Sequence, residues 1–218
     1  MKTAVIIPAY NEAENVGEVC REAKKFADEV IVVDDGSSDT TGEIALKEKA
    51  VLLQHITNLG KGSAAKTGCE YALTEGFEAI VLMDADSQHN PSDIPRFLEA
   101  LKGNDIALGY RKLDRNMPLI LKFGNRLINK TIRFLYGIEV RDSQCGFRAF
   151  TAEAYKMIKW KSNDYSMESE MITKIGKHRL KYGEVQIGTL YADRYKGTTV
   201  LDGVKIVFNL LMWKLNNI

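Results

Sequence analysis

The sequence predicts an α/β fold in which a mostly parallel, Rossmann-like sheet is flanked by helices. Short apolar runs alternate along the chain with segments whose apolar residues recur at helical spacing, as in successive strand–helix units. Several of these runs end directly in polar or acidic residues, and the carboxyl ends of parallel strands share one edge of a sheet. The expected strands comprise residues 3–7, 30–33, 51–54, 80–83 and 105–109.

Helices are expected between these strands. Asn15 precedes the first helical pattern, Ser38 or Asp39 can cap the second, and the glycine-bearing loop 58–63 opens the third. Ser92 is expected to cap the fourth helix, because it follows a proline and precedes an apolar periodic segment.

Length and composition fit one large globular domain, or one domain with an appendage. The net charge of the 218 residues is +1, so no general affinity for nucleic acid is expected. Cys20, Cys69 and Cys145 are far apart and form no metal-binding pair, which predicts a reducing compartment. The sequence shows no signal-peptide pattern after Met1 and no apolar run of the ~18 residues that a spanning helix needs.

The stretch 80–89 is the most informative part of the sequence. Its four apolar residues suit a strand buried on both faces, and Asp84 and Asp86 follow that strand one residue apart. Ligands of open α/β sheets bind beyond the carboxyl ends of the strands, so both carboxylates are expected at the mouth of a crevice. Together with the oxygen of Gln88 they suit Mg²⁺ or Mn²⁺ bound with a substrate phosphate. Taken alone, the motif is more typical of a polar turn with solvated acids, and the neighbouring motifs overturn that interpretation.

Two further strand ends favour a nucleotide site. Tyr10 and Glu12 follow the first strand, and Asp34 and Asp35 follow the second. The glycine fingerprint of dinucleotide-binding proteins is absent after the first strand, and the 60–62 segment lacks the spacing of a phosphate-binding P-loop. Three converging polar loops therefore predict a nucleotide-sized site of another kind.

Five motifs in this order resemble those of inverting family-2 glycosyltransferases with the GT-A fold. They are residues 7–12 (IPAYNE), 34–39 (DDGSSD), 58–62 (NLGKG), 84–89 (DADSQH) and 142–150 (DSQCGFRAF). The last motif is more specifically similar to the branch that glycosylates dolichyl or polyprenyl phosphate. The resemblance spans roughly residues 4–197 and implies a nucleotide-sugar donor, with GDP-mannose favoured and UDP-glucose or another UDP-sugar as the alternative.

The resemblance also implies roles for single residues. Asp84, Asp86 and Gln88 would hold the metal and the diphosphate, with Asp86 essential for catalysis. A later segment departs from the family pattern, because Thr198 and Thr199 stand where Ser-Lys is usual. The other implied donor contacts are Pro8, Tyr10, Glu12, Asp34, Asp35 and Lys61, with Arg194 and Lys196 as basic candidates.

The second half is expected to contain a helix with two unlike faces. Leu119, Phe123, Leu127 and Phe134 mark an apolar face, whereas Lys122, Arg126, Lys130 and Arg133 mark a basic one. Such a helix suits an anionic membrane surface, and an ordinary surface helix with a solvated charged face is the alternative. Farther on, Glu168 and Glu170 are expected to precede a helix that runs to about Leu180, and a strand is expected within 181–190.

The expected domain division is a catalytic domain over residues 1–197 and an apolar helix over 198–218. That helix is expected to lie in a membrane interface, to dock on a partner such as a separate membrane-anchoring subunit, or to close the core. The enzyme is accordingly expected to be cytoplasmic and peripheral on the cytoplasmic membrane face.

The expected acceptor is polyprenyl or dolichyl phosphate. A phosphate monoester is already anionic near neutral pH, so it needs cations to orient it more than it needs a general base. Arg111, Arg126 and Lys130 are the candidates, and the two arginines are expected to act beside the reacting phosphate. A hydroxyl acceptor would instead use Asp142, Glu168 or Glu170 as a base. A non-catalytic nucleotide-sugar-binding subunit is a further alternative, which the intact metal motif disfavours.

Overall fold

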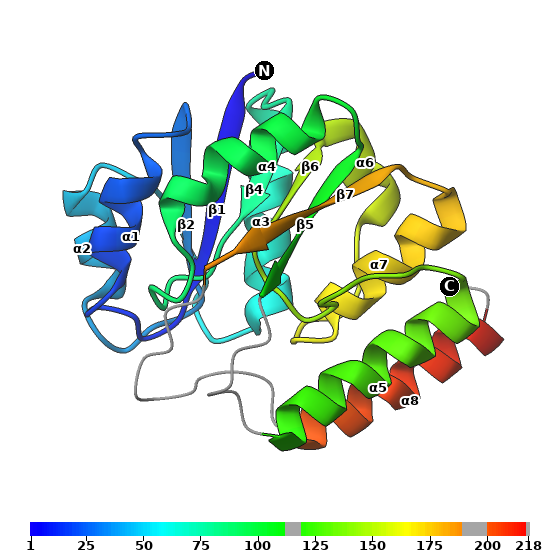
Figure 1. The fold of residues 1–218 in the computed structure, drawn as a ribbon. Coiled ribbons are helices and arrows are strands. Elements are labelled where there is room, and N and C mark those ends of the chain that lie inside the picture. Colours follow the sequence, from blue (N-terminus) through cyan, green and yellow to red (C-terminus); the bar gives the residue numbers. More distant parts are fainter. Residues whose placement is uncertain (112–118, 189–199, 217–218) are drawn as a thin grey trace.

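A computed structural model gives the structure of residues 1–111, 119–188 and 200–216, without the side chains of 119–123 and 200–202. Within these residues one seven-stranded sheet has the strand order β3-β2-β1-β4-β6-β5-β7 (Figure 1). The strands are β1 (Thr3–Ala9), β2 (Glu29–Asp34), β3 (Val51–Gln54), β4 (Ala79–Leu82), β5 (Ile106–Arg111), β6 (Arg148–Thr151) and β7 (Tyr182–Ile187).

The sheet is mostly parallel, as the sequence predicts. β1 pairs in parallel with β2 and β4, β2 with β3, and β5 with β7. Only β6 runs antiparallel, and it lies between β4 and β5. All five strands expected in the first half are present, as is the later strand β7, whereas β6 was not predicted.

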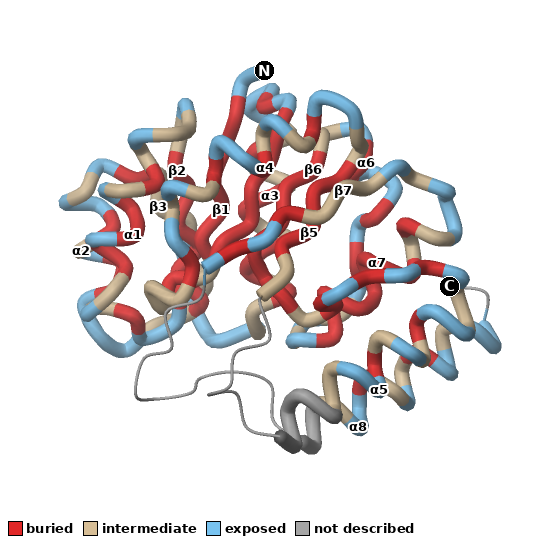
Figure 2. The backbone as a smooth tube through the Cα atoms, viewed as in Figure 1, coloured by how far each residue is buried: buried red, intermediate tan, exposed pale blue. Residues whose placement is uncertain are grey.

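Helices cover both faces of the sheet and divide its core into two clusters. Alternate β1 residues serve the two sides: Val5 and Ile7 pack with α1 (Val16–Ala23), α2 (Thr41–Lys47) and α4 (Ile94–Leu101). Ala4 and Ile6 face the other cluster, which includes α3 (Lys61–Thr74), α6 (Ala152–Ile158) and α7 (Met167–His178). Figure 2 shows the inner strands of the sheet as buried, whereas the edge strands β3 and β7 are largely half-buried or exposed.

The position of α3 depends on a close approach to the sheet. A Cβ added at Gly68 would lie 2.4 Å from Cγ2 of Ile6, so this helix packs nearer to β1 than a larger residue allows. Since α3 begins at Lys61, this packing also fixes the first turn of the helix beside the carboxyl edge of the sheet.

Two predicted helix starts were wrong. Ser92 is not the cap of α4: it lies inside a 3₁₀ turn (Pro91–Asp93), which Asn90 caps by accepting a hydrogen bond from the Ser92 N–H at 3.0 Å, and α4 begins after Asp93. Glu168 and Glu170 lie in the first turn of α7 and not before it, because acidic side chains suit the positive end of a helix. For α2, the capping position is Thr40, one residue after the predicted Asp39, whose carboxylate nonetheless accepts from the Thr41 N–H at 3.0 Å.

Helices α5 (Leu119–Tyr136) and α8 (Val200–Leu215) lie side by side at one edge of the molecule (Figure 1). The Tyr136 hydroxyl donates to the Leu210 carbonyl at 2.7 Å and joins the two helices. Ile128 and Ile132 face the core, whereas the predicted apolar face, insofar as its side chains are described, is exposed. In the described part of the chain, every helix is too short or too polar to cross a membrane.

Candidate active site

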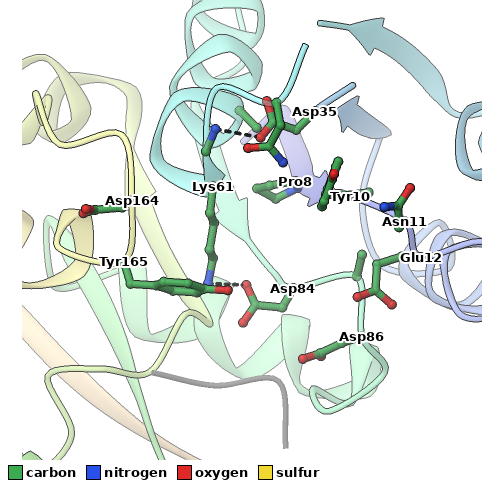
Figure 3. Close-up of a pocket in the computed structure, with 15 residues that line it drawn as sticks. Pro8, Tyr10, Asn11, Glu12, Asp35, Lys61, Asp84, Asp86, Asp164 and Tyr165 are labelled. Carbon is green, nitrogen blue, oxygen red and sulfur yellow. Dashed lines mark hydrogen bonds and ion pairs between the residues drawn. The ribbon is translucent and has the colours of Figure 1, made fainter. Parts of the chain in front are cut away.

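A cleft of about 540 Å³ opens at the carboxyl ends of β1, β2 and β4 (Figure 3). Each of these strand ends contributes acidic or polar side chains, so the structure brings together three of the polar loops that the sequence singles out. The first turn of α3 and the segment before α7 complete the wall. The cleft is lined by Pro8, Ala9, Tyr10, Asn11, Glu12, Asp35, Asn58, Gly60, Lys61, Ala64, Asp84, Ala85, Asp86, Asp164 and Tyr165.

An ion-pair cluster lies at the centre of the cleft. The Lys61 ammonium is 2.6 Å from Asp84 Oδ1 and 3.1 Å from Glu168 Oε1. Burial alone would raise the pKa of Asp84, but the charges of Lys61 and other neighbours outweigh it and hold that pKa below its usual value. Burial would lower the pKa of Lys61, yet its two carboxylate partners raise it, so the ammonium stays protonated. Burial lowers the pKa of the nearby His89 to about 4, and its imidazole is therefore neutral at pH 7.

Asp86 has a different environment from Asp84. Its Oδ1 accepts the Gln88 N–H at 3.0 Å, and no side-chain cation lies as close to it as Lys61 does to Asp84 among the described contacts. Burial and the charge of Asp84 raise the pKa of Asp86 to about 6. Figure 3 shows the Glu12, Asp84 and Asp86 carboxylates on the same side of the cleft.

The two aspartates that end β2 face different ways. Asp35 lines the cleft and accepts from the Leu59 and Gly60 N–H groups at 3.0 and 2.8 Å, and His55 Nδ1 lies 2.7 Å from it. Asp34 is not brought to the cleft, because its carboxylate accepts from the Ser37 N–H and the Gln54 side chain. Asp35 therefore holds the loop before α3 as well as facing the cleft, and its removal is expected to disturb both.

Two of the three candidate bases are engaged in structural contacts. The carboxylate of Asp142 forms a bidentate pair with Arg111, with Nε–Oδ2 at 2.7 Å and Nη2–Oδ1 at 3.1 Å. Burial opposes ionisation of Asp142. The charge of Arg111, together with the hydrogen bonds that Asp142 accepts, outweighs burial and holds the pKa of that carboxyl below its usual value. Glu170 pairs with Lys174 at 2.9 Å and accepts from the Lys161 and Ser162 N–H groups.

Arg126 and Lys130 lie in a second hollow of about 230 Å³ that shares no lining residue with the cleft. Arg133 and Arg141 also line it, and they pair with the carboxylates of Glu139 and Glu184 at 3.1 and 3.4 Å. The three predicted acceptor residues are thus separated: Arg111 is bound to Asp142, and the other two lie in this basic hollow.

Several cleft residues were missed by sequence reasoning. Asn11 and Asn58 lie within motifs whose other members were singled out, and Asp164 and Tyr165 come from the segment before α7. The signal at Asp164 is ambiguous, because its carboxylate also accepts the Ser166 N–H at 2.9 Å, as an ordinary helix-start residue does. Gln88 is not among the lining residues. Arg194 and Lys196 lie outside the described residues.

The cleft residues fit a small divalent cation bound jointly with a ligand. In residues 1–111, 119–188 and 200–216, no three His, Cys, Asp or Glu side chains form a metal site by themselves. Mg²⁺, however, is commonly held by one or two carboxylates together with substrate phosphates. Burial first, and then the charge of Asp84, raise the pKa of Asp86, and a bound cation would favour its ionised form. A Cβ at Gly146 would lie 2.7 Å from Asp84 Oδ2, so only glycine leaves this oxygen accessible.

The cation-free protein should show different pH effects at the two cleft aspartates. Because the pKa of Asp86 is raised to about 6, its ionisation costs folding free energy as the pH rises from about 4 through 6. Asp86→Asn should therefore be more stable than wild type near pH 8, and this advantage should vanish near about pH 4. Urea unfolding in chelator measures it.

Asp84→Asn is the matched control. Since the pKa of Asp84 is lowered, its ionised form stabilises the folded protein throughout the range above about pH 4. This stabilisation is lost only in stronger acid, as the carboxylate becomes protonated. This variant should be less stable than wild type at both about pH 5 and about pH 8. The same pH trend in both variants would contradict the two assigned environments.

Comparisons with known proteins agree with this geometry. Residues 4–158 match the glycosyl transferase family 2 model. The UDP-N-acetylglucosamine–dolichyl-phosphate N-acetylglucosaminyltransferase of Methanococcus voltae is 34% identical, covering 98% of this chain and 96% of its own. The polyprenol monophosphomannose synthase of Mycolicibacterium smegmatis is 30% identical, covering 97% and 86%.

A solved structure shows the same fold. Glucosyl-3-phosphoglycerate synthase from Mycobacterium tuberculosis, in complex with Mn²⁺, UDP-glucose and phosphoglyceric acid, superposes with a TM-score of 0.79. The match covers 98% of this chain and 79% of that one at 19% identity, so it bears on the fold alone. With the family match over more than half of the chain, we conclude that this protein belongs to glycosyl transferase family 2 and is a glycosyltransferase with the GT-A fold.

Proposed function

We propose that this glycosyltransferase moves one hexose from a nucleotide sugar to polyprenyl or dolichyl phosphate, with inversion at the anomeric carbon and with Mg²⁺ or Mn²⁺ at Asp84 and Asp86. The observation that carries the proposal is the meeting of these two carboxylates with the Lys61 ammonium at the carboxyl edge of the sheet. Opposite charges at this place suit a diphosphate and its cation together.

The reaction is a single displacement. An acceptor phosphate oxygen forms the new bond to the anomeric carbon while the bond from that carbon to the diphosphate breaks, and the electron pair leaves with the nucleoside diphosphate. The cation supplies neutralisation of the leaving charge when it is bound. Lys61 would donate to diphosphate oxygens, and Glu12 and Asp35, which line the same cleft, would accept from ribose or base groups.

A phosphate acceptor fits the carboxylates that the structure provides. A hydroxyl nucleophile requires a base that can take its proton, yet Asp142 and Glu170 are bound to arginine, lysine and backbone N–H groups. A phosphate monoester carries its negative charge already. The names of the two relatives, which act on dolichyl phosphate or make polyprenol monophosphomannose, support the same acceptor class.

GDP-mannose is the first donor to test, and the mannose-synthase relative supports it, whereas the Methanococcus relative uses UDP-N-acetylglucosamine. GDP-mannose, UDP-glucose and UDP-N-acetylglucosamine should therefore be compared by thermal shift with and without Mn²⁺, because a ligand that binds only the folded state raises the apparent stability.

Asp86→Ala is expected to lower sugar transfer on the order of 100-fold or more, because it removes an oxygen ligand worth several kcal/mol to the leaving diphosphate. Transfer rates measured against Mn²⁺ concentration test this. Glu99→Ala, which alters an exposed pair with Lys102 on α4, is the control and should behave as wild type. Full activity in chelator would end the metal-dependent interpretation.

The basic hollow is the proposed contact for the acceptor phosphate. Arg126 and Lys130 lie one helical turn apart on α5, and Arg141 faces them from the segment after the helix. Arg111 belongs in the proposal only as a support for this region, because its guanidinium is already bound to Asp142. Replacing Arg111 would leave a buried carboxylate unpaired, so it tests folding more than acceptor binding.

Arg126→Ala should lower transfer to a short-chain polyprenyl phosphate by roughly 10- to 150-fold, which corresponds to the loss of a charge-assisted contact of about 1.5–3 kcal/mol. Donor hydrolysis and donor affinity should change little. Arg21→Ala, an exposed arginine paired with Glu48, serves as the control. Wild-type transfer by Arg126→Ala, or glycosylation of hydroxyl acceptors alone, would contradict the lipid-phosphate proposal.

Helices α5 and α8 are the proposed membrane-contacting face. Leu127 and Phe134 on α5 are exposed, as are Val204, Phe208 and Leu215 on α8, with Phe134 at 88%. Arg126, Lys130 and Arg133 accompany this apolar surface on α5. Exposed apolar side chains beside basic ones suit the surface of an anionic bilayer, which agrees with a peripheral enzyme at the cytoplasmic membrane face.

Phe134→Asp combined with Phe208→Asp should reduce binding to vesicles of phosphatidylglycerol and phosphatidylcholine at least about tenfold, since two exposed aromatic side chains can no longer enter the bilayer. Raising the salt concentration should weaken wild-type binding by screening the basic side chains. Leu46→Asp, at an exposed site on α2, is the control. If the isolated wild type ignores vesicles, a membrane-anchoring subunit becomes the better occupant of this face.

A further inference from the structure

Lys61 has two carboxylate partners that differ in position. Asp84 lines the cleft and has a side chain 27% exposed, whereas the Glu168 side chain is 3% exposed and approaches Lys61 from α7. The ring of Tyr165 lies 5.6 Å from the same ammonium. Lys61 thus connects an accessible carboxylate to a buried one.

The buried partner is held in an unusual way. Glu168 Oε1 contacts Lys61, but its Oε2 is buried and, among the described residues, has no hydrogen-bond partner. A buried charge with an unsatisfied oxygen is unfavourable unless its attraction to a nearby cation compensates. The Arg148 guanidinium donates to the Glu168 carbonyl at 2.8 Å. This bond fixes the backbone of Glu168 and therefore the position from which its side chain reaches Lys61.

A cation bound at Asp84 would change the electrostatic environment of the Lys61 ammonium. A divalent ion bound to Asp84 places positive charge within a few ångströms of the ammonium, and like charges at that range repel strongly in a partly buried site. Without a second partner, Lys61 would have to leave the cleft or compete with the cation for Asp84.

We propose that Glu168 is a positioning residue that anchors Lys61, so that Asp84 can turn to the cation while the ammonium stays at the diphosphate. The inference rests on the proposed cation–nucleotide site and assigns a function to a carboxylate that does not line the cleft. Glu168 acts through Lys61 and has no contact with the reacting atoms.

Glu168→Gln tests this role, because it removes the charge and keeps the shape. With one negative charge fewer and Lys61 left to Asp84 alone, the Mn²⁺ concentration that half-saturates nucleotide binding should rise roughly tenfold. The affinity for UDP and GDP in chelator should not fall, since the ammonium remains and its surroundings become more positive. Calorimetry with each nucleotide and MnCl₂ gives both quantities, and thermal melting is measured alongside.

Two further variants separate positioning from folding. Glu170→Gln alters a neighbouring buried carboxylate of α7 that does not contact Lys61, so it should lower the melting temperature without shifting the Mn²⁺ dependence. The double variant Lys61→Met with Glu168→Gln removes both charges, so its Mn²⁺ affinity should recover to at least the wild-type value while its nucleotide affinity falls.

The outcomes are distinct. A wild-type Mn²⁺ dependence in Glu168→Gln overturns the inference. It is also overturned if nucleotide binding weakens equally in chelator and in Mn²⁺, because a purely structural residue would give that result. If wild type itself binds no nucleotide in a Mn²⁺-dependent manner, the proposed function fails first. Those results are separable because the wild-type titration is independent of every variant.

Discussion

The carboxylates at the ends of β2 and β4, one buried and one half-buried, each need a partner, and these partners determine the shape of the cleft. Asp35 accepts from the N–H groups of Leu59 and Gly60, and Asp84 pairs with Lys61. Both partners lie in the segment that leads into α3. The same two strand ends that face the ligand therefore also fix where α3 begins, and the first turn of that helix becomes a wall of the cleft.

The opposite wall depends on this arrangement. A Cβ at Gly60 would lie 2.3 Å from the Asn163 carbonyl, and one at Gly62 would lie 2.3 Å from the Ser162 carbonyl. Close backbone contact is thus possible only with glycine at both places. It brings the segment before α7, including Asp164 and Tyr165, to the mouth of the cleft. The glycines of the 58–62 motif consequently serve packing, and the lysine between them serves the charge cluster.

The sequence was sufficient for the sheet and for the edge at which the site lies. Strand–helix alternation and acids at the strand ends are local signals, and they identify Asp84, Asp86 and Asp35 as cleft residues. The short strand β6 escaped prediction because it begins with Arg148, and a charged residue gives no sign of burial in a sequence. Arg148 is buried nonetheless, since the Ser143, Cys145 and Glu168 carbonyls accept its hydrogen bonds.

Partner choice between distant segments could not be predicted at all. The sequence places Arg111 just after the expected strand 105–109 and predicts that it is available to a phosphate, but the fold brings Asp142 to within 2.7 Å of it. Likewise, Asp34 and Asp35 are adjacent in sequence and differ only in which side of the strand they face. Such outcomes depend on tertiary packing, which spacing along the chain does not encode.

The cleft and the basic hollow are separate cavities, and a chain of hydrogen bonds leads from the hollow through Asn125 and Asp142 to Arg111. Asp142 binds Arg111 at one side and the Asn125 amide, at 3.0 Å, at the other, and Asn125 lines the hollow. Burial acts to raise the pKa of Asp84. The positive charges around it, among them Arg111, together outweigh burial and hold that pKa below its usual value. Asn129 adds a second connection, because it donates to the Arg141 carbonyl and accepts from the Ser143 N–H. The 142–150 motif therefore ties α5 to Arg111, whose charge acts on Asp84 in the cleft, as the proposed transfer between two anionic substrates in one fixed geometry would require.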